Sequence, residues 1–322
     1  MRKGLKAIAI TDHDIFEGIE EVLEARRGFS LEIIPGIEWS TNEKGVEILC
    51  YFPDTEKFLA DYKAGKFNSR LIPLTQAREK RMAEMIKKAQ ELGAFRNEGI
   101  IVPHIEEFKE EVAEITPFRY WFIPGALSVY LWKKYKDNFN RLGCKSPNDV
   151  YNRYLIGQGL LGPFETELDI SPGGVAEYAK EVGGLSVLAH PKDMENKGRR
   201  TKSEVKEFIF NLARRKLIVG VQVDDRRNSR ADTLSYVRMV KEWNKQNPSW
   251  PLVMISGSDH HSFGPDYNYE LGCGRVDKEN PQGNLIPWIG KYETTVALLK
   301  KKSTASPLGK RSLSLFSRQF RP

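Results

Sequence analysis

The sequence contains few cysteines, and their positions do not favour a disulfide or a zinc site. Cys50, Cys144 and Cys273 are odd in number, far apart and free of any Cys-x-x-Cys pair. This pattern predicts neither a disulfide framework nor a cysteine-based zinc site. We therefore expect reduced thiols and a cytoplasmic protein.

Long apolar runs are also missing. No run approaches the roughly 18 residues that a transmembrane helix needs. The first residues lack the charged-then-apolar order of a secretory signal. The composition, 40% hydrophobic and 29% charged, is that of an ordinary globular chain without membrane contact. Its 322 residues are enough for one large domain or two smaller domains with a real core.

Excess charge is confined to one end of the chain. The net charge is +7, and residues 299–322 contain seven Lys or Arg and no acid, so the remaining residues are neutral. This segment is rich in Ser and has two prolines, which predicts a disordered basic tail. A solvated tail and a weak contact with nucleic acid both stay open.

Apolar runs predict strands separated by polar, helix-like segments. In the first part they cover residues 6–11, a segment from 30 that ends at Pro35-Gly36, and residues 45–52. A helix is predicted over residues 75–93, with Gly93 as its C-cap, and the chain stays mostly helical to about residue 168.

Alternation of strands and helices resumes after residue 170. Ser171 and Pro172 predict the start of a helix, with Ser171 as N-cap and Pro172 in the first turn. Three more strands are predicted over residues 185–191, 217–223 and 251–256. The order of elements indicates an α/β fold interrupted by a mostly helical insertion.

Ionisable side chains follow the predicted strands where each strand ends. They are Asp12, His13, Glu38, His190, Asp259 and His261. The carboxyl ends of parallel strands share one rim, so we expect these side chains to converge. Imidazole and carboxylate together suit Zn, Mn or Fe, and paired ions suit hydrolysis of phosphate esters.

A structural role for each histidine is the alternative. A lone His after a strand is often a satisfied structural residue, and "SGSD" is also common turn chemistry. However, four of the five histidines follow predicted strands. His104 lies in the helical insertion, where we expect a surface or packing role, and His260 should point away from its neighbour His261.

Six segments of this chain resemble those of PHP-domain (polymerase and histidinol phosphatase) proteins. In order they read "GLKAIAITDHD", "IIPGIEWS", "VEILCYF", "AREKRMAEMIKKAQELG", "GGLSVLAHP" and "ISGSDHHS". Over about residues 4–275 the chain is most similar to stand-alone metal-dependent phosphoesterases of the 3′,5′-nucleoside bisphosphate phosphatase and oligoribonuclease group. The resemblance implies a distorted (β/α) barrel of seven parallel strands, with metal ions at its C-terminal rim.

The resemblance also implies roles for individual residues. The implied metal ligands are His13 in "TDH", Glu38 in "PGIE", His190 in "AHP", and Asp259 and His261 in "GSDxH". Glu38 is then the bridging carboxylate, and Glu47 occupies the position of a ligand His and can bind the same metals. Asp12 is expected to orient His13.

The resemblance divides the chain into segments. The insertion contributes Arg78, Arg81 and Arg119 as candidate phosphate contacts, although a solvated role is equally open for each. We expect the insertion to cover the rim as a cap. The expected segments are a first barrel part (1–54), the helical insertion (55–169), a second barrel part (170–298) and the tail (299–322).

One implied element lies outside the printed sequence. The family opens with a strand that carries His-x-His and a following Asp, and the printed sequence begins at Met1, in what should be the end of the next helix. Either the protein starts upstream of Met1 or the chain is a degenerate member. The five retained ligand-type positions favour the first explanation. We expect little or no phosphoesterase activity without that strand.

The expected function is metal-dependent hydrolysis of phosphate esters with Mn, Zn or Fe. The substrate would be a small phosphorylated molecule, a nucleotide or a short oligonucleotide. A non-catalytic binding or regulatory protein with a structural metal is the alternative. A nucleic-acid-binding protein acting through the tail is a third, which the neutral body of the chain argues against.

Overall fold

The computed structural model of the chain describes residues 7–28, 31–93, 95–115, 124–155, 170–225 and 228–257. The chain separates into two compact units. The first unit combines Met1–Phe67 with Asp169–Pro322, and the second is Asn68–Leu168. The sheet and the candidate site belong to the first unit.

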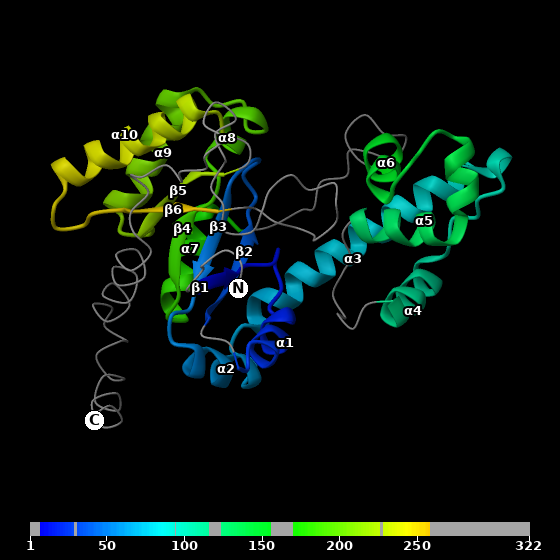
Figure 1. Ribbon diagram of the computed structural model, residues 1–322, viewed down its shortest axis with the longest axis horizontal. Coiled ribbons are helices and arrows are strands. Elements are labelled where there is room, and N and C mark those ends of the chain that lie inside the picture. The colour runs from blue at the N-terminus through cyan, green and yellow to red at the C-terminus, as the bar shows by residue number, and fades with distance from the viewer. Residues whose placement is uncertain are drawn as a thin grey trace. The chain divides into compact units, whose positions relative to one another are not determined.

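A mixed six-stranded sheet forms the centre of the first unit, within the described residues (Figure 1). Its strands, in spatial as well as chain order, are β1 (Ala7–Ile10), β2 (Glu32–Ser40), β3 (Glu47–Tyr51), β4 (Leu185–Leu188), β5 (Gly220–Asp224) and β6 (Val253–Ser256). The expected α/β class is confirmed, and each strand overlaps a predicted one.

The expectation that all strands run parallel is wrong for β3. Strand β3 runs antiparallel to both β2 and β4, whereas the β1–β2, β4–β5 and β5–β6 pairs are parallel. The physical reason is the short connection over residues 41–46, because a parallel crossover needs roughly a dozen residues or more. As a consequence, the first residue of β3 lies beside the last residue of β2.

The prediction that the second strand ends at Pro35-Gly36 is also wrong. Strand β2 pairs with β1 through Pro35 and changes to β3 from Gly36 onward. The missing N–H of Pro35 is tolerated because it lies where the pairing partner changes. A Cβ at Gly36 would lie 2.7 Å from Thr11 Cγ2 and 2.9 Å from the Cys50 carbonyl oxygen, so this crossing favours glycine. Glu38 therefore lies inside β2.

Helices cover the sheet of the first unit. Helices α1 (Gly18–Ala25) and α2 (Thr55–Lys63) contact β2, α7 (Pro172–Glu181) contacts β3 and β4, and α10 (Arg230–Gln246) contacts β5 and β6. Helices α8 (Lys192–Asn196) and α9 (Lys202–Arg214) follow β4. The predicted N-cap of helix α7 is confirmed, because the Ser171 side chain accepts a hydrogen bond from the N–H of Gly174 at 3.1 Å.

A cluster of aromatic rings anchors the segment that follows the Asp-His-Asp motif. Phe16 is buried, and its ring centroid lies 4.9 to 6.3 Å from those of Trp39, Phe52, Phe58, Tyr62 and Phe67. Most of these pairs are edge-on or tilted, which is the arrangement that aromatic quadrupoles favour. This packing holds the loop after β1 against the sheet.

The second unit is helical in its described part. Its helices are α3 (Asn68–Glu91), α4 (Ile105–Ile115), α5 (Pro124–Arg141) and α6 (Pro147–Val150), with a 3-10 turn at Arg96–Glu98 and a π-helical turn at Tyr151–Leu155. The predicted apolar face of α3 is buried, and Gly93 has φ 59° just past its end, as expected for a C-cap.

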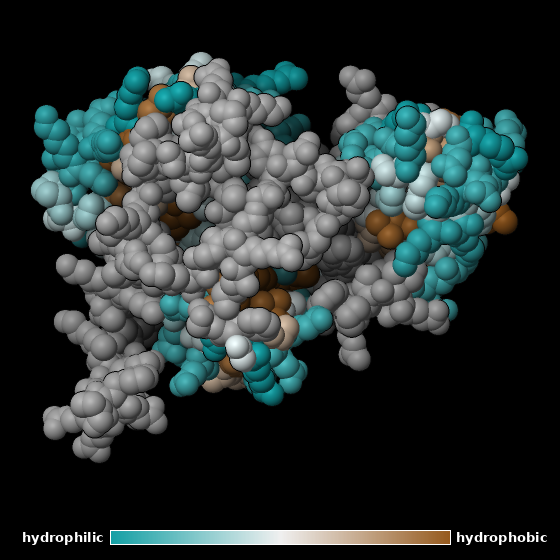
Figure 2. Space-filling view, in the orientation of Figure 1, coloured by the Kyte–Doolittle hydropathy of each residue, from teal (hydrophilic) through white to brown (hydrophobic). Residues whose placement is uncertain are grey.

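Hydrophilic residues cover most of the coloured surface in Figure 2. Large exposed apolar side chains among the described residues are Ile72, Leu92 and Ile101. None of the described helices is long and apolar enough to cross a membrane.

Candidate metal centre

The Asp-His-Asp loop is attached to β2 by its backbone. The Glu38 N–H donates to the Asp12 carbonyl at 3.0 Å, and the Asp14 N–H donates to the Glu38 carbonyl at 3.1 Å. His13 and Glu38 therefore face each other as a parallel bridge beyond the end of β1. The backbone thus sets the spacing between these two side chains.

Asp14 stabilises this loop. It is buried, has φ 58°, and accepts hydrogen bonds from the Ser40 N–H at 2.7 Å and from Ser40 Oγ at 2.8 Å. A left-handed backbone is uncommon outside glycine, and Asp tolerates it better than most residues. The last acid of the motif therefore fixes the end of β2 to the loop that carries His13.

The hairpin of β2 and β3 places two glutamates on one face. Glu38 pairs with Leu49 and Ser40 pairs with Glu47, so Glu38 and Glu47 are diagonal neighbours across the pair. The antiparallel turn makes this possible, because it puts the start of β3 at the end of β2.

His190 follows β4 and completes the cluster. Its Nε2 lies 2.7 Å from Glu38 Oε1 and 2.9 Å from Glu47 Oε2. The His190 residue is 1% exposed, and its backbone N–H donates to Gln222 Oε1 at 3.1 Å. One ring nitrogen thus faces two carboxylates in a buried position.

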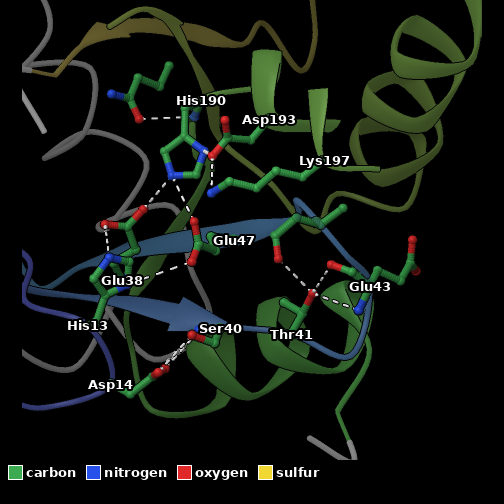
Figure 3. A network of polar contacts seen from close by, with 12 residues as sticks. His13, Asp14, Glu38, Ser40, Thr41, Glu43, Glu47, His190, Asp193 and Lys197 are labelled. Carbon is green, nitrogen blue, oxygen red and sulfur yellow. Dashed lines mark hydrogen bonds and ion pairs between the residues drawn. The ribbon is translucent and has the colours of Figure 1, made fainter. Parts of the chain in front are cut away.

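His13 lies on the more open side of the same cluster. Its Nε2 is 3.8 Å from Glu38 Oε2 and its Nδ1 is 3.7 Å from Glu47 Oε1, and its side chain is 35% exposed. Figure 3 shows the four side chains pointing toward one another from the β1 loop, β2, β3 and the end of β4. We call His13, Glu38, Glu47 and His190 the carboxylate–histidine cluster.

The protonation states of the cluster depend on one another. Burial alone raises the pKa of Glu47, but the hydrogen bond from His190 and the charges of both histidines lower it to about 2. Burial alone lowers the pKa of His190, but Glu38 and Glu47 raise it to about 10. At neutral pH an imidazolium therefore lies between two carboxylates.

The donor set fits a divalent transition metal. One ligand atom each from Glu38, Glu47 and His190 lies within 4.8 Å of the others. Carboxylate oxygen and imidazole nitrogen are ligands of Mn, Fe and Zn. In the metal-free cluster the positive charge beside the two glutamates is the proton on His190. A metal cation can replace that proton.

The other predicted site residues lie elsewhere or outside the described residues. Asp12 is exposed beside the cluster, and its orienting role toward His13 remains a prediction. Arg78 and Arg81 lie on α3 in the second unit, and their contact with phosphate remains a prediction. Asp259, His261 and Arg119 lie outside the described residues, as do His260 and the tail.

Three buried polar residues near the cluster were not predicted from the sequence. Asp14 holds the loop, Gln222 accepts from the backbone of His190, and Asp193 Oδ2 lies 3.5 Å from His190 Nδ1. Two of them left a signal in the sequence. Gln222 is a polar residue within an apolar strand, and Asp193 is a carboxylate one helical turn after a candidate ligand.

Comparison with known proteins gives distant relatives. No family model matches the chain. The chain is 23% identical over 210 residues to a 5′-3′ exoribonuclease of Haemophilus influenzae, in an alignment that covers 64% of this chain. The chain spans 65% of the length of that relative.

Solved structures show the same fold at low sequence identity. A predicted metal-dependent phosphoesterase from Bifidobacterium adolescentis matches with a TM-score of 0.59 and 19% identity, covering 87% of this chain and 85% of that one. An amidohydrolase from Chromobacterium violaceum, solved with sulfate and without metal, matches with a TM-score of 0.56 and 18% identity, covering 86% of each chain. The chain therefore has the α/β fold of these hydrolases.

Proposed function

We propose that this chain is a metal-dependent phosphoesterase of the PHP family that acts on nucleotides or short oligonucleotides. The observation that carries the proposal is the position of His190 Nε2 between Glu38 and Glu47. A structural ion pair needs one carboxylate for each imidazole. Two carboxylates on one nitrogen, with a second imidazole beside them, are typical of a site for cations.

The names of similar proteins support the chemical class. One solved structure of this fold is described as a predicted metal-dependent phosphoesterase, and the distant relative is named an exoribonuclease. The name of that relative supports a nucleotide or oligonucleotide as the substrate. The motifs around His13, Glu38 and His190 agree with the PHP resemblance, and the family assignment remains part of the proposal.

The residues of the carboxylate–histidine cluster differ in exposure, and we infer different roles for them. Glu38 and His190 are buried and would hold a cation away from bulk water, while His13 faces the open side. A divalent cation held there would supply a Lewis acid for the phosphate ester and would acidify a bound water molecule. The carboxylates of Glu38 and Glu47 would offset its two positive charges.

Metal content and hydrolysis test the proposal separately. Protein purified without chelator is analysed for Mn, Fe and Zn, before and after reconstitution, and at least about one equivalent is expected. Less than about a tenth of an equivalent after reconstitution would contradict the metal site.

Hydrolysis is measured with Mn²⁺ on a nucleoside 3′,5′-bisphosphate and on a short oligoribonucleotide. The printed chain and a form with a family-like strand fused ahead of Lys3 are compared, because the resemblance places further ligands on that strand. Phosphate or nucleotide release that chelator abolishes, in either form, supports the proposal. Metal binding without hydrolysis in both forms would favour the non-catalytic alternative.

A further inference from the structure

Asp193 lies directly behind the imidazole of His190. Helix α8 begins one residue after Pro191, and the Asp193 N–H donates to the His190 carbonyl at 2.9 Å. This turn returns Asp193 to the ring, where its Oδ2 lies 3.5 Å from His190 Nδ1. Both side chains are 2% exposed, and Figure 3 shows them side by side.

The two ring nitrogens of His190 therefore face different groups. Nε2 faces Glu38 and Glu47, whereas Asp193 is the carboxylate that faces Nδ1 among the described residues. A neutral imidazole carries its proton on one nitrogen only. A proton held on Nδ1 leaves the Nε2 lone pair free for a metal.

Lys197 offsets the charge of this buried carboxylate. Its Nζ lies 2.7 Å from Asp193 Oδ2, the same oxygen that faces the imidazole. A buried carboxylate without a cation would be costly, and one held by an ammonium group stays ionised. Gly45 packs against the backbone of Asp193, where a Cβ would come within 2.4 Å of the carbonyl oxygen, so the β2–β3 hairpin holds the turn in place.

We propose that Asp193 orients His190 for metal binding by accepting its Nδ1 proton, with Lys197 compensating the charge of the carboxylate. This inference rests on the proposed function, and it assigns a positioning role to a residue that does not itself face the metal position. Carboxylates that accept from ligating imidazoles typically contribute 10- to 100-fold to metal affinity, on the order expected here.

The test measures Zn²⁺ and Mn²⁺ affinity of the full chain and three variants. Asp193→Ala removes charge and acceptor and is expected to weaken binding about 10- to 100-fold. Asp193→Asn removes the charge and keeps an oxygen that Lys197 holds toward the ring, so its loss should be smaller. Equal losses in Asp193→Ala and Asp193→Asn would show a purely electrostatic role and overturn the proposal.

Glu195→Gln is the matched control for disturbed packing of α8. It breaks an ion pair of the same helix, with Lys192, and leaves Asp193 and Lys197 in place, so its affinity should stay within about threefold of the unmodified chain. A loss as large as that of Asp193→Ala would mean that the packing of α8 matters rather than the acceptor, and would overturn the proposal. Thermal unfolding of each variant verifies that it is folded.

The second measurement is spectroscopic and does not depend on activity. In the Zn²⁺-loaded chain with ¹⁵N-labelled histidine, the hydrogen-bonded Nδ1–H of His190 should give a low-field proton signal. The signal is assigned by its loss in His190→Gln and should be absent in Asp193→Ala. An unchanged signal in Asp193→Ala would overturn the proposal. Failure of the unmodified chain to bind metal would overturn the proposed function as well, whereas unaltered affinity in Asp193→Ala would overturn this inference alone.

Discussion

Two polar clusters of the first unit, each with a buried carboxylate, combine acidic and basic groups in different proportions. Around Asp232, one carboxylate meets two ammonium groups, with Oδ1 3.2 Å from Lys192 Nζ and 2.8 Å from Lys202 Nζ. Its Oδ2 accepts from Ser229 Oγ at 2.7 Å and from the Ser229 N–H at 3.1 Å. We call these four residues the Asp232 cluster, and its carboxylate is satisfied without any ligand.

The carboxylate–histidine cluster has the opposite balance. Glu38 and Glu47 share one buried nitrogen of His190, and His13 approaches them only to 3.7–3.8 Å. Buried carboxylates that outnumber the neighbouring cations are unfavourable unless a proton or a metal ion compensates their charge. The comparison therefore shows that polarity and burial alone do not mark a site. The excess of negative charge over fixed positive charge distinguishes the two clusters.

The largest effect should come from removing one carboxylate of the carboxylate–histidine cluster. Glu38→Gln keeps the shape and removes a candidate ligand, so we expect loss of bound metal and, in the form with the fused strand, a fall in hydrolysis of about 1,000-fold or more. Glu43→Gln is the control, because Glu43 lies in the same hairpin but pairs with Arg200. Rates and metal content are measured for both. Similar losses in both variants would contradict the assignment of Glu38 as a metal ligand.

The affinity for metal should rise with pH. Without metal, His190 holds its proton up to a pKa of about 10, and a metal must displace that proton. Each pH unit below this value then costs about tenfold in affinity, so binding of Mn²⁺ should strengthen about 100-fold from pH 6.5 to 8.5. Glu47, with a pKa of about 2, is already ionised across this range. Titrations at fixed ionic strength measure the slope, and a flat profile would contradict the prediction.

The raised pKa of His190 has the opposite effect on the stability of the metal-free fold, which should fall as pH rises. Because the folded pKa of His190 is raised from 6.5, its contribution to stability is complete below pH 6.5 and is lost as pH rises toward 10. Urea unfolding of metal-free protein between pH 6.5 and 10 measures this loss. Between pH 6.5 and 10 metal affinity should therefore rise while the stability of the metal-free fold falls.

Much of the fold was predictable because local signals decide it. Ser171 and Pro172 fixed the start of α7, and the apolar runs fixed the strands. The direction of β3 was predicted wrongly, because the resemblance outweighed the short connection over residues 41–46. The strand end at Pro35-Gly36 was predicted wrongly because a proline inside a strand is tolerated only where pairing changes, which the sequence does not show.

The candidate site was predictable in its residue types but not in its geometry. Glu38, Glu47 and His190 were expected at one rim, and the structure brings them together with His13. The roles of Asp14 and Asp193 depend on backbone turns that bring them back to Ser40 and His190. Such contacts come from tertiary packing, so the spacing of residues alone does not reveal them.

A smaller effect should follow from breaking the Asp232 cluster. Asp232→Ala removes the reciprocal cap of α10 with Ser229 and leaves Lys192 and Lys202 without their shared carboxylate. We expect a loss of about 2 kcal/mol in the free energy of unfolding at pH 7, with metal affinity unchanged. Urea unfolding and metal titration measure the two quantities. A loss of metal affinity would contradict the separation of the clusters.

The pH dependence of that loss has a definite sign. Burial alone raises the pKa of Asp232, but Lys202, Ser229 and Lys192 lower it well below 3.8. The contribution of Asp232 is therefore present above pH 3.8 and is lost as pH falls through the lowered value. The difference between Asp232→Ala and the unmodified chain should shrink in acid.

The smallest effect should come from changing one ligand type within the carboxylate–histidine cluster. Glu47→His replaces a carboxylate by the residue that the PHP resemblance implies at this position. Its side chain is 21% exposed, so an imidazole can be accommodated without filling a closed core. The variant keeps a donor but removes one negative charge. We expect Mn²⁺ affinity to fall about tenfold, and Zn²⁺ affinity to change less, because nitrogen donors suit Zn better than Mn.

Glu47→Gln is the matched control for this substitution. It removes the same charge and supplies a weak amide donor, so both metals should bind less tightly than in Glu47→His. Competition titrations give the ratio of Zn²⁺ to Mn²⁺ affinity for each variant, and this ratio should rise in Glu47→His only. An equal fall for both metals in Glu47→His would mean that Glu47 acts through its charge alone. The balance of carboxylates against fixed cations, rather than the kind of ligand, would then determine how the cluster binds metal.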